Sequence, residues 1–311
     1  MKRPGSRNAL WAGWLSLAGL VMFVLIAGPP AFAAAPTYVP GGTLDPTTIP
    51  KYVIPLVIPP PMPTSTSGLT PAADYDIAVR QFKQQILPGG LWNLLNGRAD
   101  TYAATTVWSY GRYEDPAPDI TLLGGAFAAL PTGVAPAANS TFNYPAFTVE
   151  ATSNVATTVR WMNDLVDKDP ASPRFGQYLP HLLPIDQTTH WANPPAANCV
   201  KGYPDRTDCE TAIPSPYTGP VPLVTHVHGA HVQPHSDGYA QAWYLPGAPG
   251  TKGIPPSYAE HGSLYTQANT ANAVPGSAYY AYENTQAAAT IWYHDHALGM
   301  TRLNVVAGPA G

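Results

Sequence analysis

Two short histidine pairs are the residues of this sequence best suited to bind a metal. Seven of the nine histidines lie between residues 226 and 296, and four of them form two His-x-His pairs, His226 with His228 and His294 with His296. In a β-strand, residues i and i+2 point to the same face. If two such strands meet, four imidazoles face one point. The pattern therefore predicts a metal site built from four histidines.

The ligand type narrows the choice of metal. Neutral imidazole suits copper, zinc, iron and nickel, and a set without a carboxylate argues against magnesium and calcium. Gly229 follows the first pair directly, and a glycine lets the chain turn away from the strand and leaves room for a metal and a ligand. The spacing by itself leaves the identity of the metal open.

Two other metal-binding families also use a His-x-His pair. His226, His228 and His231 come close to the H-x-H-x-D-H motif of metallo-β-lactamase-like hydrolases, but Ala230 stands where that site needs its aspartate. A cupin needs a glutamate a few residues after its pair, and the next glutamate here is Glu260. Each alternative lacks the residue that does its chemistry.

The surrounding motifs are more specific. Together they resemble the first cupredoxin domain of multicopper oxidases, in the branch of the bacterial spore-coat laccases and bilirubin-oxidase-like enzymes. The resemblance covers roughly residues 75–311 and rests on these segments: Trp161–Leu165, Leu183–Asp186 with His190, Thr225–Gly229, Ser236–Tyr239, Ala242-Trp243 and Trp292–Val305.

The resemblance implies copper as the metal. By position, His226 would bind the type 2 copper, His228 and His294 one type 3 copper, and His296 the other. Asp237 matches an acid that helps to deliver protons during oxygen reduction, a role that suits a carboxylate within hydrogen-bond reach. Strand alternation turns Asp295 away from the imidazoles, so we expect it to support the site through hydrogen bonds.

The same resemblance shows which parts are missing from the chain. The family's trinuclear cluster takes eight histidines, four of them from C-terminal cupredoxin domains, and its type 1 copper needs a His-Cys-His run that this sequence lacks. The expected function is that of the N-terminal part of a laccase-like oxidoreductase, supplying half of the trinuclear ligands. The whole enzyme would couple oxidation of a small phenolic-type donor to reduction of O₂ to water. The alternative is a non-enzymatic exported copper-binding cupredoxin module or a truncated product.

The remaining histidines and the two cysteines receive other roles. We expect His231 and His235 to be exposed to solvent, and His181, His190 and His261 to lie outside the site. Cys199 and Cys209 could close a disulfide with a short loop, as is common in an oxidising compartment.

Composition predicts the fold class. The chain has 37 prolines and 27 glycines, which exclude long helices from most of it and suit short strands joined by long loops. We therefore predict an all-β Greek-key sandwich, and the resemblance to multicopper oxidases implies that it is cupredoxin-like. Its strand-like runs are Tyr75–Arg80, alternating as a half-buried strand does, Thr105–Tyr110, Phe147–Glu150, Val155–Met162, Leu223–His228, Ala288–His294 and Thr301–Val306.

The N-terminus predicts export. Residues 1–35 combine a positive start, an apolar run and Ala31-Phe32-Ala33, as a Sec-type signal peptide does, with an uncleaved anchor as the competing interpretation. Residues 36–70 would form a proline-rich extended arm and residues 71–311 the cupredoxin domain. The protein would be extracellular or in the cell envelope. A net charge of −4 without a basic block argues against a nucleic-acid partner.

Overall fold

The chain folds into two compact units. One has the bounds Met1–Ile54 and Leu87–Ala103, and the other has the bounds Pro55–Ile86 and Ala104–Gly311. Within these bounds, the computed structural model describes residues 44–54, 58–116, 140–196, 199–201, 207–247, 251–269 and 274–311.

The predicted signal segment 1–35 lies outside the described residues, and so does the start of the predicted arm. The domain boundaries at residues 35 and 70 stay predictions. Within the part of the chain that the structure describes, none of the helices has the length and apolar character needed to cross a membrane.

The smaller unit contains two short helices, η1 (Pro46–Thr48) and α2 (Leu91–Asn96). The Asp45 carboxylate accepts a hydrogen bond from the Thr47 N–H at 2.9 Å and so caps η1. The Tyr102 hydroxyl donates to the Thr48 carbonyl at 2.6 Å, and the Asn96 side chain donates to the Val53 carbonyl at 2.9 Å. These bonds tie the two segments of the unit together.

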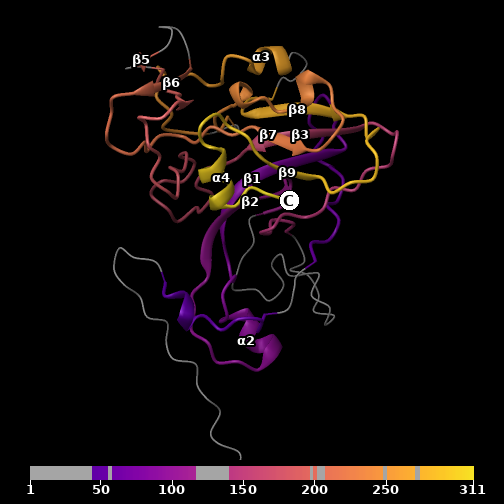
Figure 1. The fold of residues 1–311 in the computed structure, drawn as a ribbon, viewed down its shortest axis with the longest axis vertical. Coiled ribbons are helices and arrows are strands. Elements are labelled where there is room, and N and C mark those ends of the chain that lie inside the picture. The colour runs from indigo at the N-terminus through magenta and orange to yellow at the C-terminus, as the bar shows by residue number, and fades with distance from the viewer. Residues whose placement is uncertain are drawn as a thin grey trace, which may run out of the picture. The chain divides into compact units, whose positions relative to one another are not determined.

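The larger unit is built on a four-stranded sheet with the order β2-β1-β3-β8 (Figure 1). Its central pair, β1 and β3, is parallel, and the two outer pairs are antiparallel. Burial of both faces of β1 marks it as the centre of the unit. The strands are β1 (Tyr75–Gln84), β2 (Thr105–Arg112), β3 (Thr157–Asn163) and β8 (Ser277–Tyr282).

A second, two-stranded sheet packs on the first. It pairs β7 (Thr225–His228) with β9 (Trp292–Asp295) in antiparallel fashion. Tyr293 of β9 lies with its ring centroid 5.1 Å from that of Tyr110 and 5.3 Å from that of Trp161, both on the larger sheet. Such aromatic contacts bury much apolar area between the sheets. The predicted all-β sandwich is confirmed.

A third, small sheet has the order β4-β6-β5 and lies between β3 and β7 in the sequence. Its strands are β4 (Trp191–Ala192), β5 (Cys199–Lys201) and β6 (Asp208–Thr211). The disulfide Cys199–Cys209 joins β5 to β6, as the sequence had allowed.

The predicted half-exposure of β1 is wrong, because both of its faces are buried. On the outer face Asp76 pairs with Arg160 at 2.5 Å, and Arg80 pairs with Asp164 at 2.7 Å. A buried charge is tolerated when it is paired in this way. The polar residues that had indicated solvent therefore lie in a second buried layer, which also contains Ala78.

Two segments of the larger unit that were predicted to be strands are not strands. Residues Thr301–Val306 form the helix α4, because Met300, Asn304 and Ala307 are buried at helical spacing. In the run Phe147–Glu150, only an isolated bridge between Thr148 and Pro61 forms. The helices are η2 (Pro234–Ser236), η3 (Ala240–Ala242), α3 (Tyr265–Ala268) and α4 (Thr301–Ala307).

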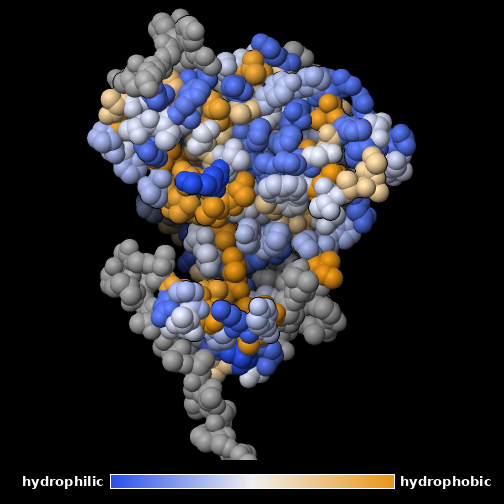
Figure 2. All heavy atoms as spheres, in the orientation of Figure 1, coloured by the Kyte–Doolittle hydropathy of each residue, from blue (hydrophilic) through white to orange (hydrophobic). Residues whose placement is uncertain are grey.

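The surface around α4 is hydrophobic (Figure 2). A groove there is lined by apolar side chains that include Ile86, Leu182 and Val306. Val306 is 67% exposed, although it belongs to a helix whose other side is buried. Apolar patches of this kind are typical of contact surfaces.

Candidate metal centre

The antiparallel register of β7 and β9 brings the two histidine pairs together. His226 lies opposite His294, and His228 lies opposite Trp292. Alternation places Thr225 on the other face of this two-stranded sheet, where its hydroxyl lies 3.2 Å from the Tyr110 hydroxyl. The two strands are thus held to the core by one face and present imidazoles on the other.

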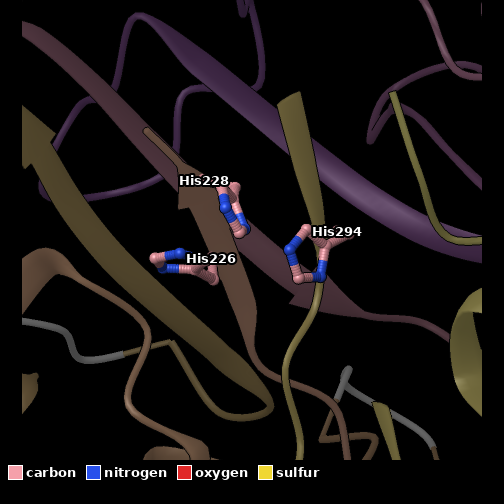
Figure 3. A group of neighbouring side chains, drawn as sticks. All are labelled: His226, His228 and His294. Atoms are coloured by element: carbon pink, nitrogen blue, oxygen red, sulfur yellow. The ribbon is translucent and has the colours of Figure 1, made fainter. Parts of the chain in front are cut away.

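Three of the four imidazoles converge. His226 and His228 reach from β7 and His294 from β9 (Figure 3), and one ligand nitrogen from each lies within 4.8 Å of the others. The ring of His296, which directly follows β9, has its centroid 4.9 Å from the His226 ring and 5.9 Å from the His294 ring. The structure therefore gathers all four predicted ligands, with His296 beside the group of three.

Backbone carbonyls fix the orientation of three of these rings. The Nδ1–H of His226 donates to the Asp237 carbonyl at 2.5 Å, that of His294 to the Asp295 carbonyl at 2.7 Å, and that of His296 to the Gly238 carbonyl at 3.1 Å. A carbonyl can only accept, so the proton of each ring is on Nδ1. Each Nε2 is then left with a lone pair, as a metal ligand requires.

The electrostatics of the site favour metal binding. The Nε2 of His294 is buried and has no hydrogen-bond partner among the residues that the structure describes. Burial lowers the pKa of His294 and of His296, and the neighbouring imidazoles lower it further. These rings therefore stay neutral at pH 7. A buried, unpartnered nitrogen of a neutral imidazole fits a copper or zinc ion.

Trp292 forms one wall of the site. Its ring stacks on His294 with a centroid separation of 4.1 Å and on His228 with a separation of 5.7 Å. His228 is exposed and Trp292 is 40% exposed, so this side of the centre is open. None of the hydrogen bonds among the described residues involves the His228 ring. Its stacking on Trp292 therefore orients it.

A tight turn at Gly238 supplies two of the carbonyls. Gly238 follows η2 with a φ of +75°, a conformation that glycine adopts without strain. A Cβ at this position would lie 2.1 Å from the Thr225 carbonyl oxygen. Only glycine lets the Asp237-Gly238 segment come this close to β7 and hold His226 and His296.

We expect Gly238→Ala to destabilise the protein by about 3 kcal/mol or more, because the added methyl meets rigid backbone. The matched control is Gly68→Ala, at a φ of +71° with open space around the new Cβ. That change should cost only about 1 kcal/mol, from the φ strain alone. Urea unfolding of both variants measures the difference, and equal losses would contradict the collision at Thr225.

A buried polar network supports the backbone of the second pair. The Asp295 carboxylate accepts hydrogen bonds from the Val224 N–H at 3.0 Å, the Ala297 N–H at 3.1 Å and the Asn304 side chain at 2.7 Å. Burial raises the pKa of the Asp295 carboxyl to about 7. The expected supporting role of Asp295 agrees with these contacts.

Asn304 is a residue that the sequence analysis missed. It is fully buried in α4. It donates to Asp295, and its side-chain oxygen lies 3.0 Å from Nε2 of His181. An asparagine inside an apolar helical run was the available signal, but the strand prediction for Thr301–Val306 concealed it.

The carboxylate of Asp237 lies at the edge of the site. Its Oδ1 is 3.5 Å from Nδ1 of His226, and the side chain is 36% exposed. This position is within reach of both the imidazole cluster and solvent. The role of Asp237 in delivering protons stays a prediction.

The other five histidines lie outside this cluster, as expected. His231 and His235 are exposed. His181 packs against Trp108, and burial lowers its pKa. His190 lies 3.4 Å from the Asp208 carboxylate, and His261 stacks on Tyr265 with ring centroids 4.6 Å apart. Both cysteines are in the disulfide, so neither offers a thiolate.

Comparison with known proteins points to one group. The rice (Oryza sativa subsp. japonica) protein named multicopper oxidase LPR1 homolog 3 is 36% identical over 169 residues, which are 54% of this chain and 22% of the rice protein. A laccase of Bacillus stratosphericus is 30% identical over 167 residues, 54% of this chain and 22% of the laccase. A laccase of Haloferax volcanii is 28% identical over 269 residues, 85% of this chain and 30% of the laccase.

These relatives confirm the resemblance to multicopper oxidases and laccases over about half of the chain or more. The chain spans only a fifth to a third of their length. None of the protein-family models matches it. A solved structure, the multicopper oxidase of Campylobacter jejuni, aligns with 91% of this chain and 32% of its own, at 12% identity and a TM-score of 0.37.

Proposed function

We propose that the chain binds copper through His226, His228, His294 and His296 and forms part of a laccase-like oxidoreductase. The observation that carries the proposal is the cluster itself, in which the Nδ1 protons are held by carbonyls and the Nε2 of His294 is buried without a partner. An imidazole core would not keep such an atom unpaired without a ligand to bind. The names of the relatives support copper and oxidase chemistry.

The proposed assignment follows the family resemblance. His226 would hold a type 2 copper, His228 and His294 one type 3 copper, and His296 the other, with the remaining ligands supplied by C-terminal cupredoxin domains. Copper, when bound, would accept single electrons and pass them to O₂, so that oxidation of a small phenolic-type donor is coupled to formation of water.

The chain's own residues would orient and protect this chemistry. The carbonyls of Asp237, Gly238 and Asp295 fix which ring nitrogen faces the metal. The Asp237 carboxylate can hold a proton at Oδ1 and exchange it with solvent, since the side chain is 36% exposed. Export to the cell envelope or beyond belongs to the same proposal, because the chain carries a disulfide.

The experiment that tests copper binding is a competition between copper and zinc on the purified chain. We expect copper to be retained in preference to zinc, in keeping with the Irving–Williams order. Elemental analysis after gel filtration gives the two stoichiometries. Preferential retention of zinc would overturn the proposal and favour a hydrolase-like site.

We expect the 311-residue chain alone to show no catalytic four-electron oxidase activity. It lacks a His-Cys-His run, and both cysteines are disulfide-bonded, so it has no route for electrons from a bulky donor. Oxygen uptake with a phenolic donor and added copper, against a control with copper alone, measures this. Catalytic conversion of O₂ to water without peroxide would contradict the expectation.

A reconstitution experiment distinguishes the oxidase proposal from the alternative of a copper-binding module. A separately produced C-terminal portion of a related laccase is added to the copper-loaded chain. Oxygen uptake that depends on both parts, and that disappears with His226→Ala, supports the oxidase. Tight copper binding with no uptake in any such pair supports the alternative of an exported copper-binding module.

A further inference from the structure

A cavity lies behind the β7–β9 sheet, on the face opposite the imidazoles. Its volume is about 210 Å³, and its lining is mostly apolar. The wall from the β7–β9 sheet includes Val227 and Tyr293, which alternate along their strands with the histidines. The wall from the larger sheet includes Val159, Trp161 and Tyr282. The cavity therefore lies between the two sheets, is partly open to solvent, and is separated from the metal centre by the β7–β9 sheet.

The size and lining of the cavity fit one aromatic ring. An apolar cavity of roughly 150 Å³ stays dry and admits benzene. The present cavity is larger, and its lining includes the aromatic residues Trp161, Tyr282 and Tyr293. Aromatic walls bind a flat ring through stacked or edge-on contacts.

Two polar groups in the wall can still form hydrogen bonds. The Tyr282 hydroxyl accepts from the Trp161 indole N–H at 2.9 Å, which is its only hydrogen bond among the described residues, so its own proton remains to be donated. Asn284 donates its amide protons to the Val155 carbonyl and the Thr157 hydroxyl, which leaves its side-chain oxygen to accept. Together they offer one donor and one acceptor.

We infer that this cavity is a binding site for a small neutral aromatic molecule with a single hydroxyl group. The ring would lie between the aromatic walls, and its hydroxyl would accept a hydrogen bond from the Tyr282 hydroxyl. This is a site of binding, distinct from the metal centre, and it does not depend on the proposed oxidase function.

The test uses phenol and toluene, which have the same number of heavy atoms and differ in the hydroxyl. Calorimetric titration of the metal-free full chain, with a chelator present, excludes binding to copper. We expect phenol to bind with a Kd of roughly 1 mM or tighter, and toluene to bind about five- to tenfold more weakly. In Tyr282→Phe the preference for phenol should disappear while toluene is unaffected.

Filling the cavity should abolish binding. Ala151 and Ala230 both line it, so Ala151→Phe or Ala230→Phe should weaken phenol binding at least tenfold. Ala171→Phe, at an exposed position outside the cavity, is the matched control and should leave the Kd unchanged. Thermal unfolding checks that each variant folds. If only one of Ala151→Phe and Ala230→Phe folds, that variant alone is enough for the test. No binding of phenol to the folded chain at about 5 mM, or an unchanged Kd in a folded filling variant, would overturn the inference.

Discussion

A chain with both His294→Ala and His296→Ala is expected to lose its copper during gel filtration, although His226 and His228 remain. His294 belongs to the group of three whose ligand nitrogens lie within 4.8 Å of one another, and its removal leaves one strand to hold the ion. Loss of a single supporting contact weakens a metal site by about 10- to 100-fold. Loss of two ligands should exceed ~100-fold, which elemental analysis detects as an absence of copper.

The matched control is the double variant His231→Ala and His235→Ala. It removes two histidines from exposed positions close to the first pair, so the number of imidazoles lost is the same. We expect its copper stoichiometry to equal that of the unchanged chain. Equal retention by both double variants would show that the cluster of four imidazoles does not bind the metal.

Replacing Asp295 by alanine should destabilise the protein by about 3–5 kcal/mol. The change leaves the N–H groups of Val224 and Ala297 and the amide of Asn304 without their acceptor. Each buried donor left unpaired costs about 1–3 kcal/mol. Urea unfolding followed by circular dichroism measures the loss. Asp295→Asn keeps the shape and one acceptor oxygen, so it should cost less and remain measurable if the alanine variant is unfolded.

Asp237→Ala provides the control for charge. It also deletes one carboxylate beside the metal centre, but from a side chain that is 36% exposed. We expect a change in stability within about 0.5 kcal/mol, as is usual for exposed positions. A loss as large as that of Asp295→Ala would mean that the charge, and not the hydrogen-bond network, stabilises this region.

Local pattern alone was enough to predict part of the site. Alternation along a strand puts His226 and His228 on one face whatever the rest of the fold does, because successive side chains point to opposite faces. The same rule turns Asp295 away from the imidazoles. The ligand type set the class of metal, and the density of proline and glycine excluded a helical protein. These properties depend on neighbours in the sequence, so the sequence contains them.

Contacts between distant segments decided the rest. The register that sets His226 opposite His294 joins residues 68 positions apart, since 294 − 226 = 68. The carbonyls that orient the rings of His226 and His296 come from a third segment, which reaches β7 only because Gly238 lacks a side chain. Two findings contradicted the local pattern: Asp76 is buried, and Thr301–Ala307 is a helix. Local pattern could not predict either one, because a buried charge needs a partner and a buried helix face needs a surface to pack on. Arg160, which pairs with Asp76, is 84 positions away, and Asn304 of α4 donates to the Pro222 carbonyl 82 positions away, so only the packed structure brings these groups into contact.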